Sequence, residues 1–103
     1  MLVDHDRYGL DRPHRINFFC PDLYACDLPT TFEIVGEAKT GLDLERPRSH
    51  LQIIAFLDYL ALQPQGRFYL CVPPLSVARA RQLLNRFKTG HRSVVPSEVI
   101  SFV

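Results

Sequence analysis

The sequence lacks any apolar stretch of about 18 residues, the shortest run that reads as a transmembrane helix, so we expect no membrane span. It also lacks the start of a secretory signal peptide, because residues 4–7 are Asp-His-Asp-Arg where such a signal has basic residues and then an apolar run. Internal repeats, low-complexity tracts and long linkers are missing as well. These absences predict a globular protein of the cytoplasm.

Cysteine is scarce, and the three present, Cys20, Cys26 and Cys71, are odd in number and form no Cys-x-x-Cys pair. Each lies in an apolar, strand-like context. We expect reduced, buried thiols, because disulfides persist mainly in oxidising compartments. The spacing matches no pattern of zinc ligands, so no zinc site is predicted.

A length of 103 residues, with 47% hydrophobic and 22% charged residues, is typical of one globular domain. We assign residues 1–103 to a single domain with one hydrophobic core. Residues 1–15 are polar, contain Gly9 and Pro13, and are interpreted as an irregular lead-in.

The formal net charge of +1 hides an asymmetry along the chain. Eight of the 11 acidic residues lie in residues 1–44, and eight of the 12 basic residues lie in residues 45–103. Nearly all of the basic residues are arginines. They would form either a phosphate-facing rim or the solvated face of a helix, and the sequence leaves both interpretations open.

Hydrophobic periodicity and turn residues predict the element order β-β-α-β-α-β after a short extended segment at 16–20. Ser49 and Ser76 are candidate N-caps of the two helices. The first helix links two strands, and such a crossover normally makes them parallel, so we predict an α/β fold with a mixed sheet. The expected ranges are strands 22–27 and 31–39, a loop at 41–47, helix 49–62, strand 67–72, helix 75–88, and a last strand formed by 94–95 and 99–103 around Pro96.

Asp22 and the triplet Glu37-Ala38-Lys39 lie at the two ends of the one expected hairpin. Side chains alternate along a strand, so Glu37 and Lys39 share a face. If the strands pair across a turn centred near residues 29–30, Asp22 falls opposite Glu37 or one pair away on the same face. Two carboxylates and one ammonium group would then converge, and such a set can hold a divalent metal against a phosphate and deprotonate a water.

Together with Pro21 before the first acid and Gln52 near the start of the next helix, this pattern resembles the PD-(D/E)xK nuclease superfamily. The resemblance covers roughly residues 16–88. It implies a restriction-endonuclease-like sandwich, in which a central mixed β-sheet is flanked by helices.

The same resemblance implies a division of roles among the motif residues. Asp22 and Glu37, with the backbone carbonyl of Ala38, would bind Mg²⁺ or Mn²⁺, which prefer oxygen ligands. Lys39 would orient or deprotonate the attacking water or stabilise developing charge, and Gln52 would hold the water or the lysine.

The implied function is metal-dependent hydrolysis of DNA phosphodiester bonds, by an endonuclease or exonuclease, in DNA repair, restriction or mobile-element processing. DNA is the expected partner. A homodimer fits this function, because cutting both strands usually takes two active sites, and so do additional domains of a longer chain. The candidate contacts to nucleic acid are Thr40, Arg46, Arg48, His50 and Arg79.

The lead-in contains no Glu, whereas many superfamily members carry a metal-binding Glu on a helix before the first strand. Either that helix lies in a missing N-terminal region of a longer protein, or the module is short and weakened. The alternative function is a nuclease-fold module that binds nucleic acid or mediates protein interaction without cutting. The motif also has a structural interpretation, in which Asp22 starts a turn and Glu37 and Lys39 form an exposed pair of little energy.

Overall fold

Four strands and two long helices follow one another in the order that the sequence predicts. The computed structural model describes residue 16 and residues 19–27 and 32–102. The predicted turn centre at residues 29–30 and the lead-in at 1–15 therefore lie outside the described residues. The elements are β1 (Leu23–Cys26), β2 (Phe32–Ala38), α1 (Gly41–Leu44), α2 (Pro47–Ala61), β3 (Gln65–Val72), the 3₁₀ turn η1 (Pro74–Ser76), α3 (Val77–Phe87), the 3₁₀ turn η2 (Gly90–Val94) and β4 (Ser97–Ser101).

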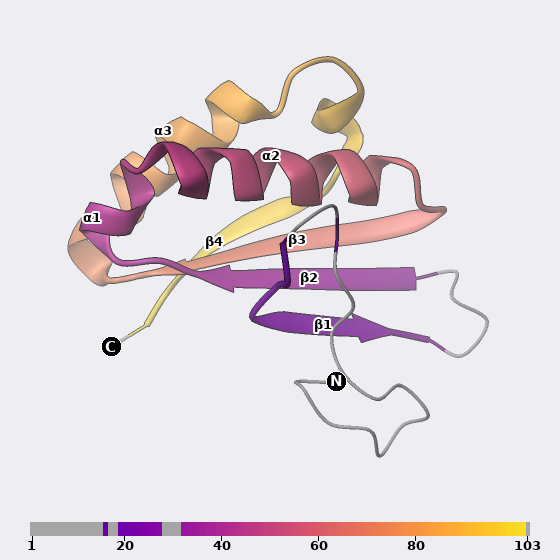
Figure 1. Ribbon diagram of the computed structural model, residues 1–103, viewed down its shortest axis with the longest axis horizontal. Coiled ribbons are helices and arrows are strands. Elements are labelled where there is room, and N and C mark those ends of the chain that lie inside the picture. The colour runs from indigo at the N-terminus through magenta and orange to yellow at the C-terminus, as the bar shows by residue number, and fades with distance from the viewer. Residues whose placement is uncertain (1–15, 17–18, 28–31, 103) are drawn as a thin grey trace.

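The strands form one mixed sheet in the order β1-β2-β3-β4 (Figure 1). β1 pairs with β2 in the antiparallel sense, with Leu23 opposite Gly36 and Cys26 opposite Glu33. β2 and β3 are parallel, as are β3 and β4. The prediction that α2 links two parallel strands is therefore confirmed, and β2 and β3 become the two central strands.

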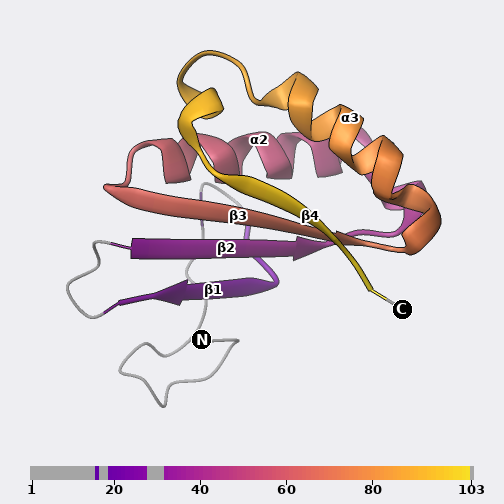
Figure 2. The same ribbon diagram turned by 180° about the vertical axis from the view of Figure 1, so that it is seen from behind.

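α2 and α3 cover the same face of the sheet, as the two opposite views in Figure 1 and Figure 2 show. The centre of the core lies between α2 and β3, where Phe56 and Phe68 are fully buried with their ring centroids 6.4 Å apart. α3 is amphipathic because its apolar residues recur three or four positions apart, which places them on one side of the helix. Its buried residues are Ala80, Leu83, Leu84 and Phe87.

The opposite face of the sheet carries neither of the two long helices in the described part of the chain (Figure 2). The described residues therefore form a small mixed α/β domain, in which a four-stranded mixed sheet carries both long helices on one face. Apolar residues on this face surround a hollow of about 450 Å³, which reaches Asp22 just before β1. Its apolar lining includes Leu23, Ile34, Tyr69 and Ile100.

Several expected boundaries were wrong for identifiable reasons. α2 begins at Pro47 with Arg46 as its N-cap, so Ser49 is a buried residue inside the helix rather than its cap. Proline suits the first helical position because the N–H that it lacks has no partner there. The expected loop at 41–47 contains the one-turn helix α1, and the end of η2 at Val94 and its C-cap Val95 stand where a strand was expected.

Two expectations drawn from composition have different outcomes. No helix in the described ranges is long and apolar enough to cross a membrane. None of the three cysteines, which all lie in the described ranges, forms a disulfide, and they are less buried than expected, since Cys20 is exposed and Cys26 and Cys71 are only partly buried.

Gly66 lies where the end of α2 meets the start of β3. A β-carbon there would be 2.9 Å from the backbone oxygen of Leu60 and 3.0 Å from its side chain. Gly66→Ala should therefore lower the free energy of unfolding by about 1–3 kcal/mol, because a helix backbone has to move. Denaturation with urea, followed by circular dichroism, measures this loss.

The matched control is Gly41→Ala at the first residue of α1. A β-carbon there would meet only the Ser76 hydroxyl oxygen, at 2.9 Å, and that hydroxyl rotates away by turning its own side chain. We expect a change within about 0.5 kcal/mol for this variant. An equal loss in both variants would show that the contact with Leu60 is not the cause.

Candidate functional site

The pairing of β1 with β2 brings Asp22 to Glu37. The register that sets Leu23 opposite Gly36 places Asp22 opposite Glu37 one step further, as the sequence predicts. Two reciprocal hydrogen bonds close this end of the hairpin: the Asp22 backbone N–H donates to Glu37 Oε1 and the Ala38 backbone N–H donates to Asp22 Oδ2, both at 2.9 Å. The two carboxylates are thus held side by side by the backbone itself.

Glu37 lies on the face of β2 that α2 covers and is only 4% exposed. Its second oxygen, Oε2, lies 3.1 Å from the ammonium nitrogen of Lys39. The lysine side chain is itself 12% exposed, and the Lys39 backbone N–H is bonded to the Cys71 oxygen of β3. The interpretation of Glu37 and Lys39 as an exposed surface pair therefore does not fit their burial.

Gln52 completes the group from a different element. Its Oε1 accepts a hydrogen bond from Lys39 Nζ at 2.5 Å, so a strand end and a helix are joined through one ammonium group. Because α2 starts at Pro47, Gln52 lies in its second turn instead of the expected first turn. The structure brings together all four side chains of the predicted catalytic set.

Burial raises the pKa of the Glu37 carboxyl above its ordinary value. The negative charge of Asp22 acts in the same direction, while the Asp22 backbone N–H and the Lys39 ammonium act against it. A raised pKa from burial beside a second carboxylate is a common property of functional sites, although structural ion pairs produce it as well. A cation between the two carboxylates would relieve the part of this increase in pKa that comes from the charge of Asp22.

The donor set fits a hard cation in its chemistry but is small. Within the described residues, no three side chains of His, Cys, Asp or Glu gather closely enough to hold a metal ion. Asp22 and Glu37 provide two carboxylates, and Ala38 adds a backbone carbonyl at the exposed end of β2. Mg²⁺ is commonly bound through one or two carboxylates while it keeps several waters. The residues present therefore fit Mg²⁺ better than a metal that needs a full protein cage.

Three of the expected nucleic-acid contacts lie around the start of α2. The Thr40 hydroxyl accepts a hydrogen bond from the Asp43 backbone N–H at 3.1 Å and so caps α1. Arg46 is 67% exposed, with its Nε 3.3 Å from the Asp43 carboxylate. The Arg48 guanidinium lies 5.0 Å from the centre of the Phe19 ring. Arg46 and Arg48 thus present positive charge to solvent.

The other two expected contacts, His50 and Arg79, are engaged in contacts that join separate elements. His50 Nε2 donates to the Leu44 backbone oxygen at 2.6 Å, and its ring lies 5.1 Å from the Phe87 ring. Arg79 makes two hydrogen bonds with the Glu45 carboxylate, at 2.7 and 2.8 Å, which lower the pKa of Glu45. Both residues connect helices to one another, and neither presents an unpaired charge.

A second buried carboxylate was missed by sequence reasoning. Glu33 lies four residues before Glu37 on β2, so both side chains are on the same face of the strand. Glu33 is 1% exposed, and its Oε1 accepts hydrogen bonds from the hydroxyls of Tyr24 and Tyr59. Its Oε2 is buried with no hydrogen-bond partner among the described residues. Burial, followed by the contact with Glu33, raises the pKa of both tyrosines. The common face of Glu33, Val35 and Glu37 was the available signal.

The Tyr59 hydroxyl is one of the two donors to Glu33, and its hydrogen bond is 2.7 Å long. Tyr59→Phe should lower the free energy of unfolding by about 1–3 kcal/mol, because a buried carboxyl group would lose a donor. Tyr69→Phe is the matched control, since Tyr69 lies on the face of the sheet away from α2; we expect a change within about 0.5 kcal/mol. Equal losses in chemical denaturation would contradict the importance of the Glu33 contact.

The raised pKa of Glu37 predicts how stability depends on pH. The unfolded glutamate loses its proton near 4.5, while the folded one keeps it to higher pH. Between these values the folded state binds more protons, so this carboxyl group lowers stability as pH rises, by up to about 1.4 kcal/mol per pH unit. Glu37→Gln should remove that component of the slope, as urea denaturation at a series of pH values would measure.

Glu98→Gln, which removes an exposed carboxylate from β4, is the control for the loss of one negative charge. The stability of Glu37→Gln relative to wild type should increase as pH rises above 4.5. The opposite sign, or the same change in Glu98→Gln, would contradict a specific effect of burying Glu37.

Comparison with known proteins does not assign the chain to a family. No protein-family model matches the chain, and neither a curated protein nor a solved structure matches it. Any function inferred for the protein therefore depends on its own residues: the Asp22, Glu37, Lys39 and Gln52 contacts and the sequence motif that they form.

Proposed function

We propose that the protein is a metal-dependent nuclease of the PD-(D/E)xK type, with a restriction-endonuclease-like fold, that hydrolyses phosphodiester bonds of DNA. The observation that carries this proposal is a continuous series of contacts through Asp22, Glu37, Lys39 and Gln52, which come from the start of β1, the end of β2 and α2. The sequence motif alone arises often by chance. Its assembly at one place is the additional support.

Asp22, Glu37 and the carbonyl of Ala38 are the groups that would hold Mg²⁺ or Mn²⁺. The metal would supply a bound water of lowered pKa and would neutralise charge on the scissile phosphate. Asp22 is exposed and Glu37 is buried. The metal would therefore be held between one carboxylate on the solvent side, from which the phosphate approaches, and one on the side of the protein interior. Burial strengthens the attraction between Glu37 and a cation, because the surrounding dielectric is low.

Lys39 is the group that would act on the attacking water. Its ammonium lies between Glu37 Oε2 and Gln52 Oε1, and this restricts the side chain to one direction. In that position it would orient the water and stabilise negative charge that develops on the phosphate oxygens. Gln52 is a positioning residue, because its contact in the structure is with the lysine.

Arg46 and Arg48 are the residues best placed to contact the DNA backbone. Both are exposed at the start of α2, the helix whose second turn carries Gln52. Phosphate contacts of this kind position the nucleic acid without reading its sequence. Because the positive charge is held by arginines, the affinity should fall with increasing salt.

A second candidate function is a related module that binds nucleic acid without cutting it. It is favoured by one observation: Glu37 uses both oxygens internally, one with the Asp22 backbone N–H and one with Lys39. A cation would have to share or replace these contacts. If the four residues served only to stabilise the end of the hairpin, these internal contacts would remain unchanged when nucleic acid binds.

The proposal predicts nicking of supercoiled plasmid DNA by the wild-type protein in Mg²⁺ or Mn²⁺, and none after chelation. Asp22→Asn and Lys39→Ala should each lower the rate by about 100-fold or more, because they remove a cation ligand and the group that acts on water. Gln52→Ala should have a smaller effect, since Lys39 keeps its contact with Glu37. Glu98→Gln should cut at the wild-type rate.

Calorimetric titration with Mn²⁺ separates the two candidate functions. A nuclease should bind the metal in the wild-type protein and lose binding in the Asp22→Ala/Glu37→Ala double variant, with circular dichroism as the check on folding. Salt-dependent DNA binding without metal binding or nicking would favour the non-cutting module. Nicking that persists in Lys39→Ala would contradict the proposed catalytic roles.

A further inference from the structure

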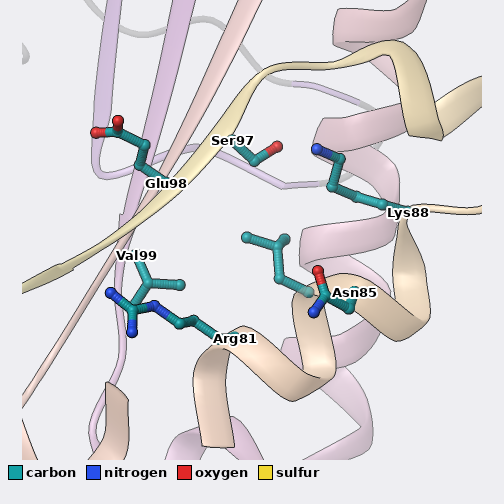
Figure 3. A pocket seen from close by; sticks show the side chains of 7 residues that line it. Arg81, Asn85, Lys88, Ser97, Glu98 and Val99 are labelled. Atoms are coloured by element: carbon teal, nitrogen blue, oxygen red, sulfur yellow. The ribbon is translucent and has the colours of Figure 1, made fainter. Parts of the chain in front are cut away.

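A groove of about 480 Å³ runs between α3 and β4, at the edge of the sheet furthest from β1. Figure 3 shows Arg81 and Asn85 of α3 and Lys88, the residue that caps its C-terminus, on one side of the groove and the strand β4 on the other. The side chain of Leu84 forms part of its lining, so the groove has an apolar base and a polar rim. It is separate from the carboxylate pair on β1 and β2.

One row of peptide groups on β4 points away from the sheet. In a parallel pair, alternate residues of a strand bond to the neighbour, and the residues between them direct their N–H and C=O groups outward. The Pro96 oxygen accepts from the Phe68 N–H, and the Phe102 N–H donates to the Val72 oxygen. The outward groups therefore belong to the residues of odd number, namely Ser97, Val99 and Ser101.

These outward groups lie at a strand that ends the sheet within the described residues, since β4 has β3 as its one neighbour. Exposed sheet edges of this kind are templates for pairing with another extended chain. Addition of a peptide strand to such an edge is a recurring mode of recognition, in which the backbone provides affinity and alternate side chains provide specificity.

Positive charge lies along one side of the groove. Arg81 and Asn85 are four positions apart on one face of α3, and Lys88, which caps the helix, lines the same groove. None of the three makes an ion pair or a hydrogen bond to another side chain in the described part of the chain, whereas Arg79 and Arg92 are both paired with carboxylates. Two cations therefore face the groove uncompensated.

Glu98 is the acidic residue that lines the same groove, but Figure 3 shows its carboxylate directed away from α3. This direction follows from strand alternation, because Val99 packs toward the core on the helix side and Glu98 must then point to the other face. An added strand would therefore meet positive charge on its helix-facing side and negative charge on its other side.

We propose that the outer edge of β4 binds an extended peptide segment of a partner protein, with acidic side chains toward α3. Such a peptide would pair with the outward groups of Ser97, Val99 and Ser101, and every second side chain would approach Arg81 or Lys88. This surface is independent of the proposed nuclease site, and its test does not depend on cleavage.

Charge decides against a second copy of this chain as the occupant. If two β4 strands paired about a two-fold axis, both α3 helices would lie on the same face of the joined sheet. Their Arg81 and Lys88 side chains would then face each other across the new pair of strands, and like charges in that position repel. A nucleic-acid strand has no backbone amides that could continue the sheet.

The test uses the purified full chain and a fluorescent peptide in which glutamate and valine alternate. Fluorescence anisotropy should show binding to the wild-type protein, and Arg81→Glu/Lys88→Glu should weaken it by about tenfold. A peptide in which lysine replaces glutamate should show the reverse preference. Arg67→Glu/Arg86→Glu changes the net charge equally outside the groove and should bind the acidic peptide as the wild type does.

Backbone NMR supplies a readout that net charge alone would not move. Pairing with the peptide should shift and protect the amide protons of Ser97, Val99 and Ser101, and should spare those of Glu98 and Ile100, which face β3. Absence of binding, or equal weakening in both double variants, would overturn the proposal. The proposal would also be overturned if the acidic peptide failed to produce the alternating amide pattern and a single-stranded oligonucleotide or self-association of the protein produced it instead.

Discussion

The burial of one face of β2 against α2 is the constraint on which the rest of the structure depends. Alternation sends Glu33, Val35 and Glu37 to that face, and their exposed fractions are 1%, 0% and 4%. A strand that places two carboxyl groups beneath a helix is stable only if both receive partners, because an unpaired buried charge is strongly unfavourable. The two glutamates obtain those partners in different ways, and this difference separates a structural group from a candidate reactive one.

Glu33 receives two tyrosine hydroxyls, which are neutral donors that come from β1 and α2 and link both to β2. Glu37 instead receives a backbone N–H and a lysine ammonium at the end of the hairpin, where Asp22 is exposed. The first arrangement is closed by protein on every described side. The second joins the buried Glu37 and the largely buried Lys39 to Asp22, which is exposed, so that a cation and a phosphate could approach from the side of Asp22. This contact with an exposed carboxylate is why the proposed chemistry is assigned to Glu37 and not to Glu33.

The parallel strands separate the two proposed surfaces. The carboxyl end of β2 meets the start of α1 and α2, and ligand sites of open α/β sheets commonly lie at the carboxyl ends of their strands. The edge of β4 lies two strands away, where α3 covers the sheet on one side and leaves a row of peptide groups unpaired. Binding of a protein partner at β4 would therefore leave the carboxylate pair accessible. The basic residues divide in a corresponding way, with Arg46 and Arg48 near the first surface and Arg81 and Lys88 at the second.

The sequence by itself determined the order of the elements, because alternation and helical periodicity are local properties of the chain, and the crossover rule gave the parallel step from β2 to β3. It placed Asp22 opposite Glu37 or one pair away, and the pairing of β1 with β2 decided between the two. It also placed Gln52 on the helix that follows the triplet. Tertiary structure alone decided that Glu37 and Lys39 are buried rather than exposed, since burial depends on α2 covering β2. It alone paired Arg79 with Glu45 and Glu33 with two tyrosines, because these partners are 34, 9 and 26 residues apart and only packing brings them together. Hydrophobic periodicity also did not predict which side of the sheet each helix covers. It shows that a face of an element is apolar, but not which neighbouring element will pack against that face.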